Sequence, residues 1–237
     1  MGRAYSRLYL SYRTGAFSFA QAQSALGGRL QQTKIVLSRL HAFRAVVVFE
    51  RSRPRVYRVM DPEGVVLIAS GEVAGLQSVA QERYLHLIVA ACLDVLGRHP
   101  DASIALYGSV ARGSATELSD VDLLVVSAGL TGSLGSRAAD LGGGERVRRE
   151  IGFLFERGIH PSPSFYALRP EELCLEPPIL LDLTQDAIVL RDPTRVLRRV
   201  LDDLRSRLAA RGARRVFLSD GSWYWDLAPG GEGVASI

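Results

Sequence analysis

Two aspartates separated by one residue are the first feature of this sequence that could do chemistry. Asp120 and Asp122 begin a segment that continues as an unbroken apolar run to Val126, which indicates a strand entering a buried sheet. Because successive side chains point to opposite faces of a strand, the two carboxylates share one face, roughly 6–7 Å apart. Two like charges on one face favour a cation between them, and Mg²⁺ usually takes one or two carboxylates plus phosphate oxygens. The spacing therefore predicts a Mg²⁺ site at Asp120 and Asp122.

A glycine–serine pair lies shortly before these aspartates, at the end of another predicted strand. Residues 104–107 form the apolar strand, Gly108 and Ser109 break it, and residues 110–113 can begin and end a short helix. Glycine lets the backbone approach a ligand closely, and amide groups at a helix start favour phosphate. A Gly-Ser pair or an Asp-x-Asp pair alone is common in solvated turns. Their combination between two apolar strands favours a nucleotide–metal site.

The stretch 103–126 resembles the signature of the nucleotidyltransferase superfamily that includes DNA polymerase beta. The pattern is Gly-Ser, then Arg-Gly, then Ser-Asp-x-Asp-Leu, which this chain matches at Gly108, Ser109, Arg112, Gly113, Ser119, Asp120, Asp122 and Leu123. The resemblance implies a nucleoside triphosphate (NTP) held by Gly108 and Ser109, and Mg²⁺ held by Asp120 and Asp122, which would also be the catalytic pair. Arg112 and Ser119 belong to the same nucleotide-binding set.

The third strand departs from the pattern of active members, which carry a third carboxylate there. Residues 160–168 read as this strand, and they offer Ser162, Ser164 and Tyr166 but no acid. Three outcomes stay open: weak activity, a substitute acid from elsewhere, or binding without catalysis. Asp182 and Asp186 are candidate substitutes, although the sequence favours solvated helix carboxylates at both positions.

Composition and charge narrow the classes of protein that fit. The chain has 237 residues, 47% of them hydrophobic, which is enough for one large domain or two small ones. No apolar run reaches the roughly 18 residues of a membrane span, and residues 1–12 lack a signal-peptide core, so we expect no membrane partner and a cytoplasmic location. Neither Cys92, expected in the core, nor Cys174 has metal-ligand spacing.

The charge is distributed asymmetrically along the chain. Residues 1–60 hold 11 Arg and Lys residues and one acid, Glu50, for a net charge of +10. The chain has 29 basic and 25 acidic residues in total. Residues 61–237 therefore hold 18 basic and 24 acidic residues, for a net charge of −6. A basic front end on an acidic body indicates a polyanionic partner for the front end.

The basic front end has the pattern of a winged helix-turn-helix. Helices are expected at residues 3–14, 19–26 (with Ser18 as N-cap) and 30–43, and strands at 45–50 and 55–60 around the turn 51–54. The apolar face of the third helix is expected to be Ile35, Val36, Leu40 and Phe43. In such a fold this helix enters the major groove of duplex DNA and the hairpin lies against the backbone.

The expected DNA contacts follow from that geometry. The groove-facing residues are Gln31, Gln32, Lys34, Ser38 and Arg39, and those reaching phosphates are Arg51, Arg53 and Arg55. The alternative is a module that packs on a protein partner and does not touch nucleic acid. The wider chain also resembles archaeal proteins that join an N-terminal winged helix to a nucleotidyltransferase domain.

The remaining segments are expected to complete an α/β (α+β) protein. The expected elements are a strand at 65–69, a linker at 70–75, a long helix at 76–97, helices at 133–141 and 145–157, a helix at 178–186, a strand at 188–190, a helix from 193 to 211 and a hairpin at 214–227 with its turn at Asp220-Gly221. In the hairpin, Trp223 and Trp225 are expected to seal an apolar edge.

These observations together predict a winged helix at 1–72, a nucleotidyltransferase-like mixed-sheet domain at 76–191 and a C-terminal helix and hairpin at 192–237. If active, the protein moves a nucleoside monophosphate from an NTP to a hydroxyl acceptor. The rival hypothesis is a DNA-binding regulator, or an antitoxin, whose second domain binds nucleotide or a partner protein with little or no turnover.

Overall fold

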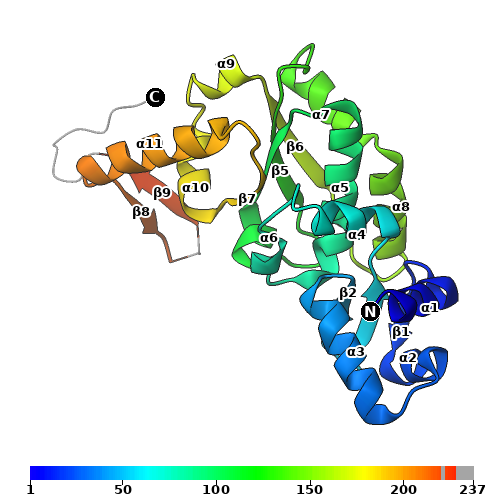
Figure 1. Ribbon diagram of the computed structural model, residues 1–237. Helices are drawn as coiled ribbons and strands as arrows, with labels where there is room; N and C mark the ends of the chain where they lie inside the picture. The colour runs from blue at the N-terminus through cyan, green and yellow to red at the C-terminus, as the bar shows by residue number, and fades with distance from the viewer. Residues whose placement is uncertain (220–221, 228–237) are drawn as a thin grey trace.

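The computed structural model describes residues 1–219 and 222–227, so the expected turn at Asp220-Gly221 and the tail from residue 228 lie outside the described residues (Figure 1). Helices and strands alternate along most of the chain, which bears out the expected mixture of both. No helix in these described ranges is long and apolar enough to cross a membrane.

The N-terminal part packs three helices against a small antiparallel sheet. Its elements are α1 (Gly2–Tyr12), β1 (Ala16–Ser18), α2 (Phe19–Leu26), α3 (Leu30–Ala42), β2 (Val46–Glu50) and β3 (Val56–Val59), with strand order β1-β3-β2. Ser18 caps α2 as expected, because its side chain accepts from the backbone of Gln21 while the Gln21 side chain accepts from Ser18. Leu8, Phe17 and Leu37 lie in the small core between these elements.

A four-stranded mixed sheet forms the centre of the molecule, with strand order β6-β5-β4-β7. Its strands are β4 (Ser103–Tyr107), β5 (Val121–Val126), β6 (Pro163–Leu168) and β7 (Ile188–Arg191). The strands β5 and β6 are parallel, whereas β4 pairs antiparallel with both β5 and β7.

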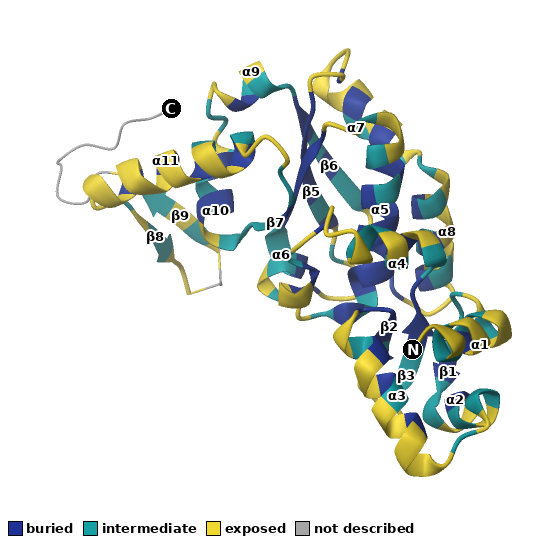
Figure 2. Cartoon of the chain, viewed as in Figure 1, coloured by how far each residue is buried: buried dark blue, intermediate teal, exposed yellow. Residues whose placement is uncertain are grey.

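Helices cover both faces of the central sheet (Figures 1 and 2). One face carries α5 (Leu85–Arg98), α7 (Leu134–Gly142) and α8 (Glu145–Phe155), and the other carries α9 (Pro170–Leu173), α10 (Ile179–Asp186) and α11 (Val196–Ala210). A strand buried on both faces must be apolar at every position. This explains the unbroken apolar run after Asp122.

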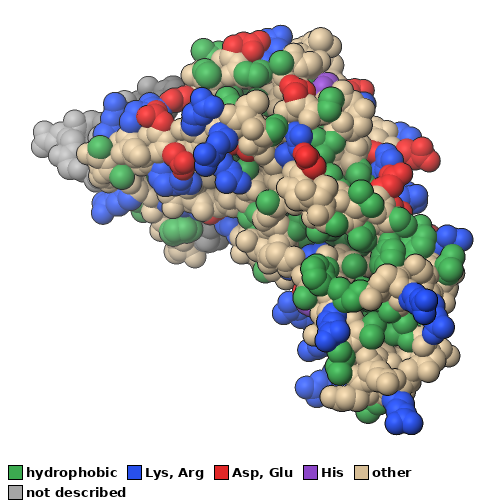
Figure 3. All heavy atoms as spheres, viewed as in Figure 1, with side chains coloured by type: hydrophobic (Ala, Val, Ile, Leu, Met, Phe, Trp, Pro, Cys, Tyr) green, Lys and Arg blue, Asp and Glu red, His purple; other side chains and the backbone are tan. Residues whose placement is uncertain are grey.

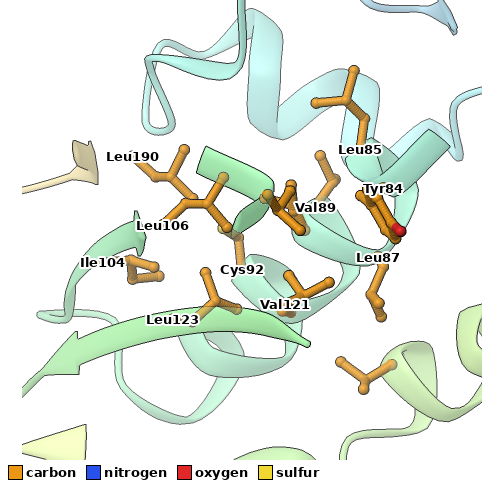
Figure 4. Packing of buried hydrophobic residues seen from close by; sticks show 14 of the residues in the cluster. Tyr84, Leu85, Leu87, Val89, Cys92, Ile104, Leu106, Val121, Leu123 and Leu190 are labelled. Atoms are coloured by element: carbon orange, nitrogen blue, oxygen red, sulfur yellow. The ribbon is translucent and has the colours of Figure 1, made fainter. Parts of the chain in front are cut away.

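Successive side chains of β5 point to opposite faces of the central sheet, and this determines which face carries the candidate site. Val121 and Leu123 belong to the cluster under α5, where they lie beside Cys92 and Leu106 (Figure 4). The next residue, Leu124, belongs to the opposite cluster, under α10 and α11. Asp122 has the same parity as Leu124, so its carboxylate lies on the face covered by the C-terminal helices.

The C-terminal segment adds α11 and a two-stranded hairpin, β8 (Arg214–Phe217) and β9 (Trp223–Asp226). The indole N–H groups of Trp223 and Trp225 both donate to Asp182 Oδ1 on α10, at 3.0 Å each. The two tryptophans therefore attach the hairpin to α10 on the side of the sheet that carries Asp122.

Three local expectations are wrong. Residues 65–69 are not a strand but part of α4 (Pro62–Ala69), because Asp61 accepts from the backbone of Glu63 as an N-cap and Pro62 suits the first helical turn. The expected helix 76–97 begins only at Leu85. Before it lie two 3₁₀ turns, η1 (Leu76–Ser78) and η2 (Glu82–Tyr84).

The third wrong expectation concerns the buried face of α3. Its core-facing residues are Thr33, Leu37 and Leu40, whereas Ile35 and Phe43 are 46% and 63% exposed. Leu40 is buried and Val36 packs against the small core as expected, so the expected face is wrong at Ile35 and Phe43 only.

A buried ion pair joins the N-terminal part to α8. Arg58 on β3 is fully buried, and its Nη2 lies 2.9 Å from Glu150 Oε2. The guanidinium also donates to the carbonyl oxygen of Thr14 at 2.8 Å and lies 3.6 Å from the centre of the Phe153 ring. Burial lowers the pKa of Arg58 to about 10, and the neighbouring Glu150 partly opposes this shift.

Removing one member of this ion pair is expected to lower the free energy of unfolding more than replacing both members with apolar residues. Glu150→Ala leaves the Arg58 charge buried without its partner and should lower the free energy of unfolding by about 3–5 kcal/mol. The double variant Arg58→Met/Glu150→Met should recover most of that loss. Urea denaturation of both variants checks this, and a double variant as unstable as Glu150→Ala would contradict it.

Candidate functional site

The two aspartates lie at the end of β5 where the central sheet meets α6 (Gly108–Arg112). Asp122 is paired with Tyr107 on β4 and with Ser164 on β6, so hydroxyl-bearing residues flank it on both neighbouring strands. Asp122 is partly buried, and Asp120 is exposed just before the strand begins. The carboxylates thus stand at the boundary between the sheet and solvent.

Gly108 and Asp122 are in very close contact. A Cβ atom built on Gly108 would lie 2.2 Å from Asp122 Oδ2, and Gly108 also has φ +73°, in the left-handed region. Glycine is therefore required twice, by the backbone conformation and by the carboxylate beside it. This contact brings the Gly-Ser turn and the Asp-x-Asp pair, 14 residues apart in sequence, into one site.

The Asp122 carboxylate is held in an unfavourable electrostatic environment. Burial and the nearby Asp120 raise the pKa of Asp122, while a hydrogen bond with Ser164 and the charge of Arg112 oppose the shift. Burial also raises the pKa of Tyr107 to about 12, with further contributions from Asp122 and Tyr166. A cation beside the two carboxylates would relieve the cost of ionising Asp122.

Ser119 shapes the loop that leads into Asp120. Its Oγ accepts from the Thr116 backbone N–H at 2.8 Å and lies 3.1 Å from the Thr116 hydroxyl. On the other side of the loop, Gln81 pairs with the backbone of Ala115 through both its amide oxygen and its amide nitrogen. No local pattern in the sequence indicates this role of Gln81, because the contact joins residues 34 positions apart.

Arg112 lies between the site and the C-terminal hairpin. Its Nη1 is 3.1 Å from Asp186 Oδ2, and its guanidinium lies over the Trp223 ring at 4.8 Å. Arg215 on β8 binds the same carboxylate at 3.0 Å. The C-terminal extension therefore borders the candidate site through Arg112.

The two acids considered as substitutes for a third carboxylate already have partners. Asp186 is shared by two arginines, and Asp182 accepts from two tryptophans. Neither is the freely solvated helix carboxylate that the sequence favours. Ser164 is paired with Asp122 on β6, the strand on which the resemblance to the superfamily implies a third carboxylate.

The carboxylates of Asp120 and Asp122 suit a divalent cation that takes its remaining ligands from phosphate and water. They are too few to surround a metal ion with protein ligands alone. Across the described ranges, no cluster of three or more His, Cys, Asp or Glu residues could hold a metal ion. Two carboxylates on one edge nevertheless match Mg²⁺, which keeps several waters and takes substrate phosphates as further ligands. Asp120 and Asp122 are therefore the residues that could hold it, with the Ser164 hydroxyl nearby.

The residues expected to contact DNA are all exposed, and four of them line two different hollows. These residues are Gln31, Gln32, Lys34, Ser38 and Arg39 on α3, and Arg51, Arg53 and Arg55 around the β2–β3 hairpin. Lys34, Ser38 and Arg55 line one hollow of about 460 Å³ between α3 and the hairpin. Gln32 lines a different hollow, beside α1. Figure 3 shows basic side chains at intervals over this N-terminal part.

The raised pKa of Asp122 gives a testable dependence of stability on pH. A carboxyl with a raised folded-state pKa contributes stability that is present below its unfolded pKa of about 3.9 and lost as the pH rises through the folded value. In metal-free buffer, Asp122→Asn should therefore raise the melting temperature near pH 7 and change it little near pH 3.5. Thermal denaturation measures both, with Asp202→Asn on the exposed face of α11 as the matched control. A lower melting temperature for Asp122→Asn near pH 7 would contradict the assignment.

Comparison with known proteins concerns the middle of the chain. A family model described as Nucleotidyltransferase domain matches residues 90–161, from within α5 to just before β6. The matched range contains the Gly108–Ser109 turn and both aspartates, and it ends before Ser164. No curated protein matches the chain. The family match supports the nucleotidyltransferase superfamily for this segment and a nucleotidyl-transfer function in general.

Proposed function

We propose that this protein binds an NTP with Mg²⁺ at Asp120, Asp122 and the Gly108–Ser109 turn. The observation that carries the proposal is the close contact of Gly108 with Asp122, where a Cβ would lie 2.2 Å from the carboxylate. This contact joins a turn suited to phosphate with a carboxylate pair suited to a cation. The match of a nucleotidyltransferase model to residues 90–161 supports the same assignment.

Each residue has a role that follows from its position. Asp120 and Asp122 would hold Mg²⁺, which when bound supplies positive charge against the phosphates. Gly108 leaves room for Asp122, and Ser109 follows it at the open end of the sheet. Arg112, already within reach of the Asp122 charge, can add a positive charge to the phosphate site.

Turnover is expected to be slow. An active enzyme of this type would transfer a nucleoside monophosphate to a hydroxyl acceptor and release pyrophosphate, and a base would take the acceptor proton. Ser164 is not a base, and Tyr107 has a pKa of about 12. Asp182 and Asp186 are engaged by the hairpin and by Arg112. Binding without rapid transfer is therefore the expected behaviour.

We propose further that the N-terminal part is a winged helix that binds duplex DNA in the cytoplasm. Support comes from the element order, the strand order β1-β3-β2 and the +10 charge of residues 1–60. In this proposal a DNA phosphate lies between α3 and the hairpin, in the hollow that Lys34, Ser38 and Arg55 line together with apolar side chains. We assign DNA binding to residues 1–72 and nucleotide binding to residues 76–191. The C-terminal part, residues 192–237, borders the nucleotide site through its hairpin.

The second candidate function is a DNA-binding regulator whose central domain binds nucleotide, or a partner protein, with little or no catalysis. The Ser164 hydroxyl in place of a third carboxylate favours it. The two candidates differ in the rate of transfer and share the binding sites. Transfer assays therefore separate them.

Loss of both carboxylates should weaken the binding of Mg²⁺–NTP. Calorimetry with wild type and with Asp120→Ala/Asp122→Ala should show at least a ~10-fold loss of affinity, because even outer-shell ligand partners cost 10–100-fold in metal sites. Asp202→Ala serves as the control on a distant exposed carboxylate. Equal affinity in the double variant would remove the site assignment.

Duplex DNA binding should depend steeply on salt. Each neutralised phosphate contributes about −0.9 to the slope of log affinity against log salt concentration. Gel shifts with the full chain should show this slope, and Arg51→Ala/Arg53→Ala/Arg55→Ala should reduce its magnitude by up to ~3. The matched triple variant on α11 and its C-cap, Arg198→Ala/Arg199→Ala/Arg211→Ala, should leave the slope unchanged. No shift even at low salt would instead favour docking on a protein partner.

Supplying the third carboxylate should speed up chemistry. Ser164→Asp places an acid beside Asp122, and general-base assistance is typically worth ~10²–10⁴-fold. Transfer from labelled NTP in saturating Mg²⁺ should rise in Ser164→Asp and not in the neutral control Ser164→Asn. Wild-type transfer at ~1 s⁻¹ or faster would refute the expected slow turnover.

A further inference from the structure

The short segment 81–84, at η2, contacts both of the proposed binding surfaces. It separates the N-terminal part from α5 and lies where the sequence predicted an uninterrupted helix. Its side chains have two sets of partners: Glu82 contacts α3 and β2. Gln81, Arg83 and Tyr84 contact the loop before Asp120. Each set is linked by direct hydrogen bonds.

Glu82 binds the N-terminal part through a buried carboxylate that is 7% exposed. Its Oε2 lies 2.8 Å from His41 Nε2, at the end of α3, and accepts from the Val48 backbone N–H at 2.8 Å. Its Oε1 lies 3.1 Å from Arg44 Nη1 and 3.9 Å from the exposed Arg51. Burial opposes ionisation here, but these hydrogen bonds and charges lower the pKa of Glu82.

Gln81 and Tyr84 bind the loop of the nucleotide site. Gln81 Nε2 donates to the Ala115 carbonyl oxygen at 2.7 Å, and the Ala115 N–H donates to Gln81 Oε1 at 3.0 Å. The Tyr84 hydroxyl donates to the Thr116 carbonyl oxygen at 2.6 Å. This loop continues through Ser119 directly into Asp120, so segment 81–84 helps to set the position of the first carboxylate.

Two of the residues that contact Glu82, His41 and Arg51, lie beside the proposed DNA surface. His41 lines the hollow between α3 and the hairpin, together with Lys34 and Arg55. Arg51, 75% exposed, belongs to the hairpin residues expected to reach phosphates. DNA phosphates in this hollow and against the hairpin would compete with Glu82 for contacts with His41 and Arg51.

We infer that Glu82 is a positioning residue that makes the two proposed binding events oppose one another. Phosphates bound at the hollow and at the hairpin draw His41 and Arg51, respectively, away from Glu82. The segment 81–84 then loosens, and the loop that positions Asp120 loosens with it. Duplex DNA therefore weakens the binding of Mg²⁺–NTP, and by thermodynamic reciprocity Mg²⁺–NTP weakens the binding of duplex to the same extent. This inference rests on the proposed function.

The test measures each affinity with and without the other ligand, using the full chain. The probes are the Mg²⁺ complex of α,β-methylene-ATP, which blocks transfer, and a duplex of ~20 base pairs. In wild type the duplex should raise the nucleotide Kd by at least ~5-fold, and the nucleotide should raise the duplex Kd by the same factor. Glu82→Gln should bring both factors to within ~2-fold of one.

Two further variants keep the test decisive. Tyr84→Phe removes only the hydroxyl that binds Thr116, on the side of the segment that faces the nucleotide site. It should reduce the ratio of the Kd values measured with and without the other ligand, and it provides this test even if Glu82→Gln fails to fold. Glu72→Gln is the matched control, because Glu72 is an exposed carboxylate paired with Arg191 at 3.1 Å, and it should keep the wild-type factor. If the Kd ratio is one in wild type, or is unchanged in both Glu82→Gln and Tyr84→Phe, this inference is wrong and the proposed function is unaffected. Absence of either wild-type binding isotherm contradicts the proposed function and removes the inference with it.

Discussion

The contact between the Asp122 carboxylate and the backbone of Gly108 is the constraint on which the candidate site depends. It arises because β5 is buried on both faces after Asp122, which fixes the register of the strand and leaves its polar end at α6. Only glycine fits at position 108, where a side chain would collide with the carboxylate. The two aspartates are thus held together, at an electrostatic cost that appears as the raised pKa of Asp122.

Elements on both sides of the central sheet adjoin this contact. The C-terminal hairpin reaches it through Arg112, which shares Asp186 with Arg215 and lies over Trp223. The N-terminal part reaches it through the segment 81–84 and the loop before Asp120. The buried pair Arg58–Glu150 fixes the N-terminal part against α8 independently of both routes. Changes at either end of the chain can therefore affect the position of the carboxylates.

Local signals in the sequence predicted much of the fold and little of what surrounds the site. The Gly-Ser turn, the apolar strand after Asp122 and the Ser18 cap were readable because each depends on neighbouring residues. The apolar run at residues 65–69 was misread, because a short apolar run fits a strand or a helix until the cap at Asp61 is weighed. The partners of Asp182, Glu82 and Gln81 lie more than 30 positions away along the chain, and no spacing in the sequence indicates them.

The most direct test of the central claim is to locate a bound cation. Anomalous diffraction from crystals grown with Mn²⁺ and α,β-methylene-ATP distinguishes the metal from water and places the triphosphate at the same time. The account predicts one Mn²⁺ peak bonded to carboxylate oxygens of Asp120 and Asp122, with phosphate oxygens against the Gly108–Ser109 turn. A triphosphate bound elsewhere, or a Mn²⁺ peak away from these two aspartates, would contradict it.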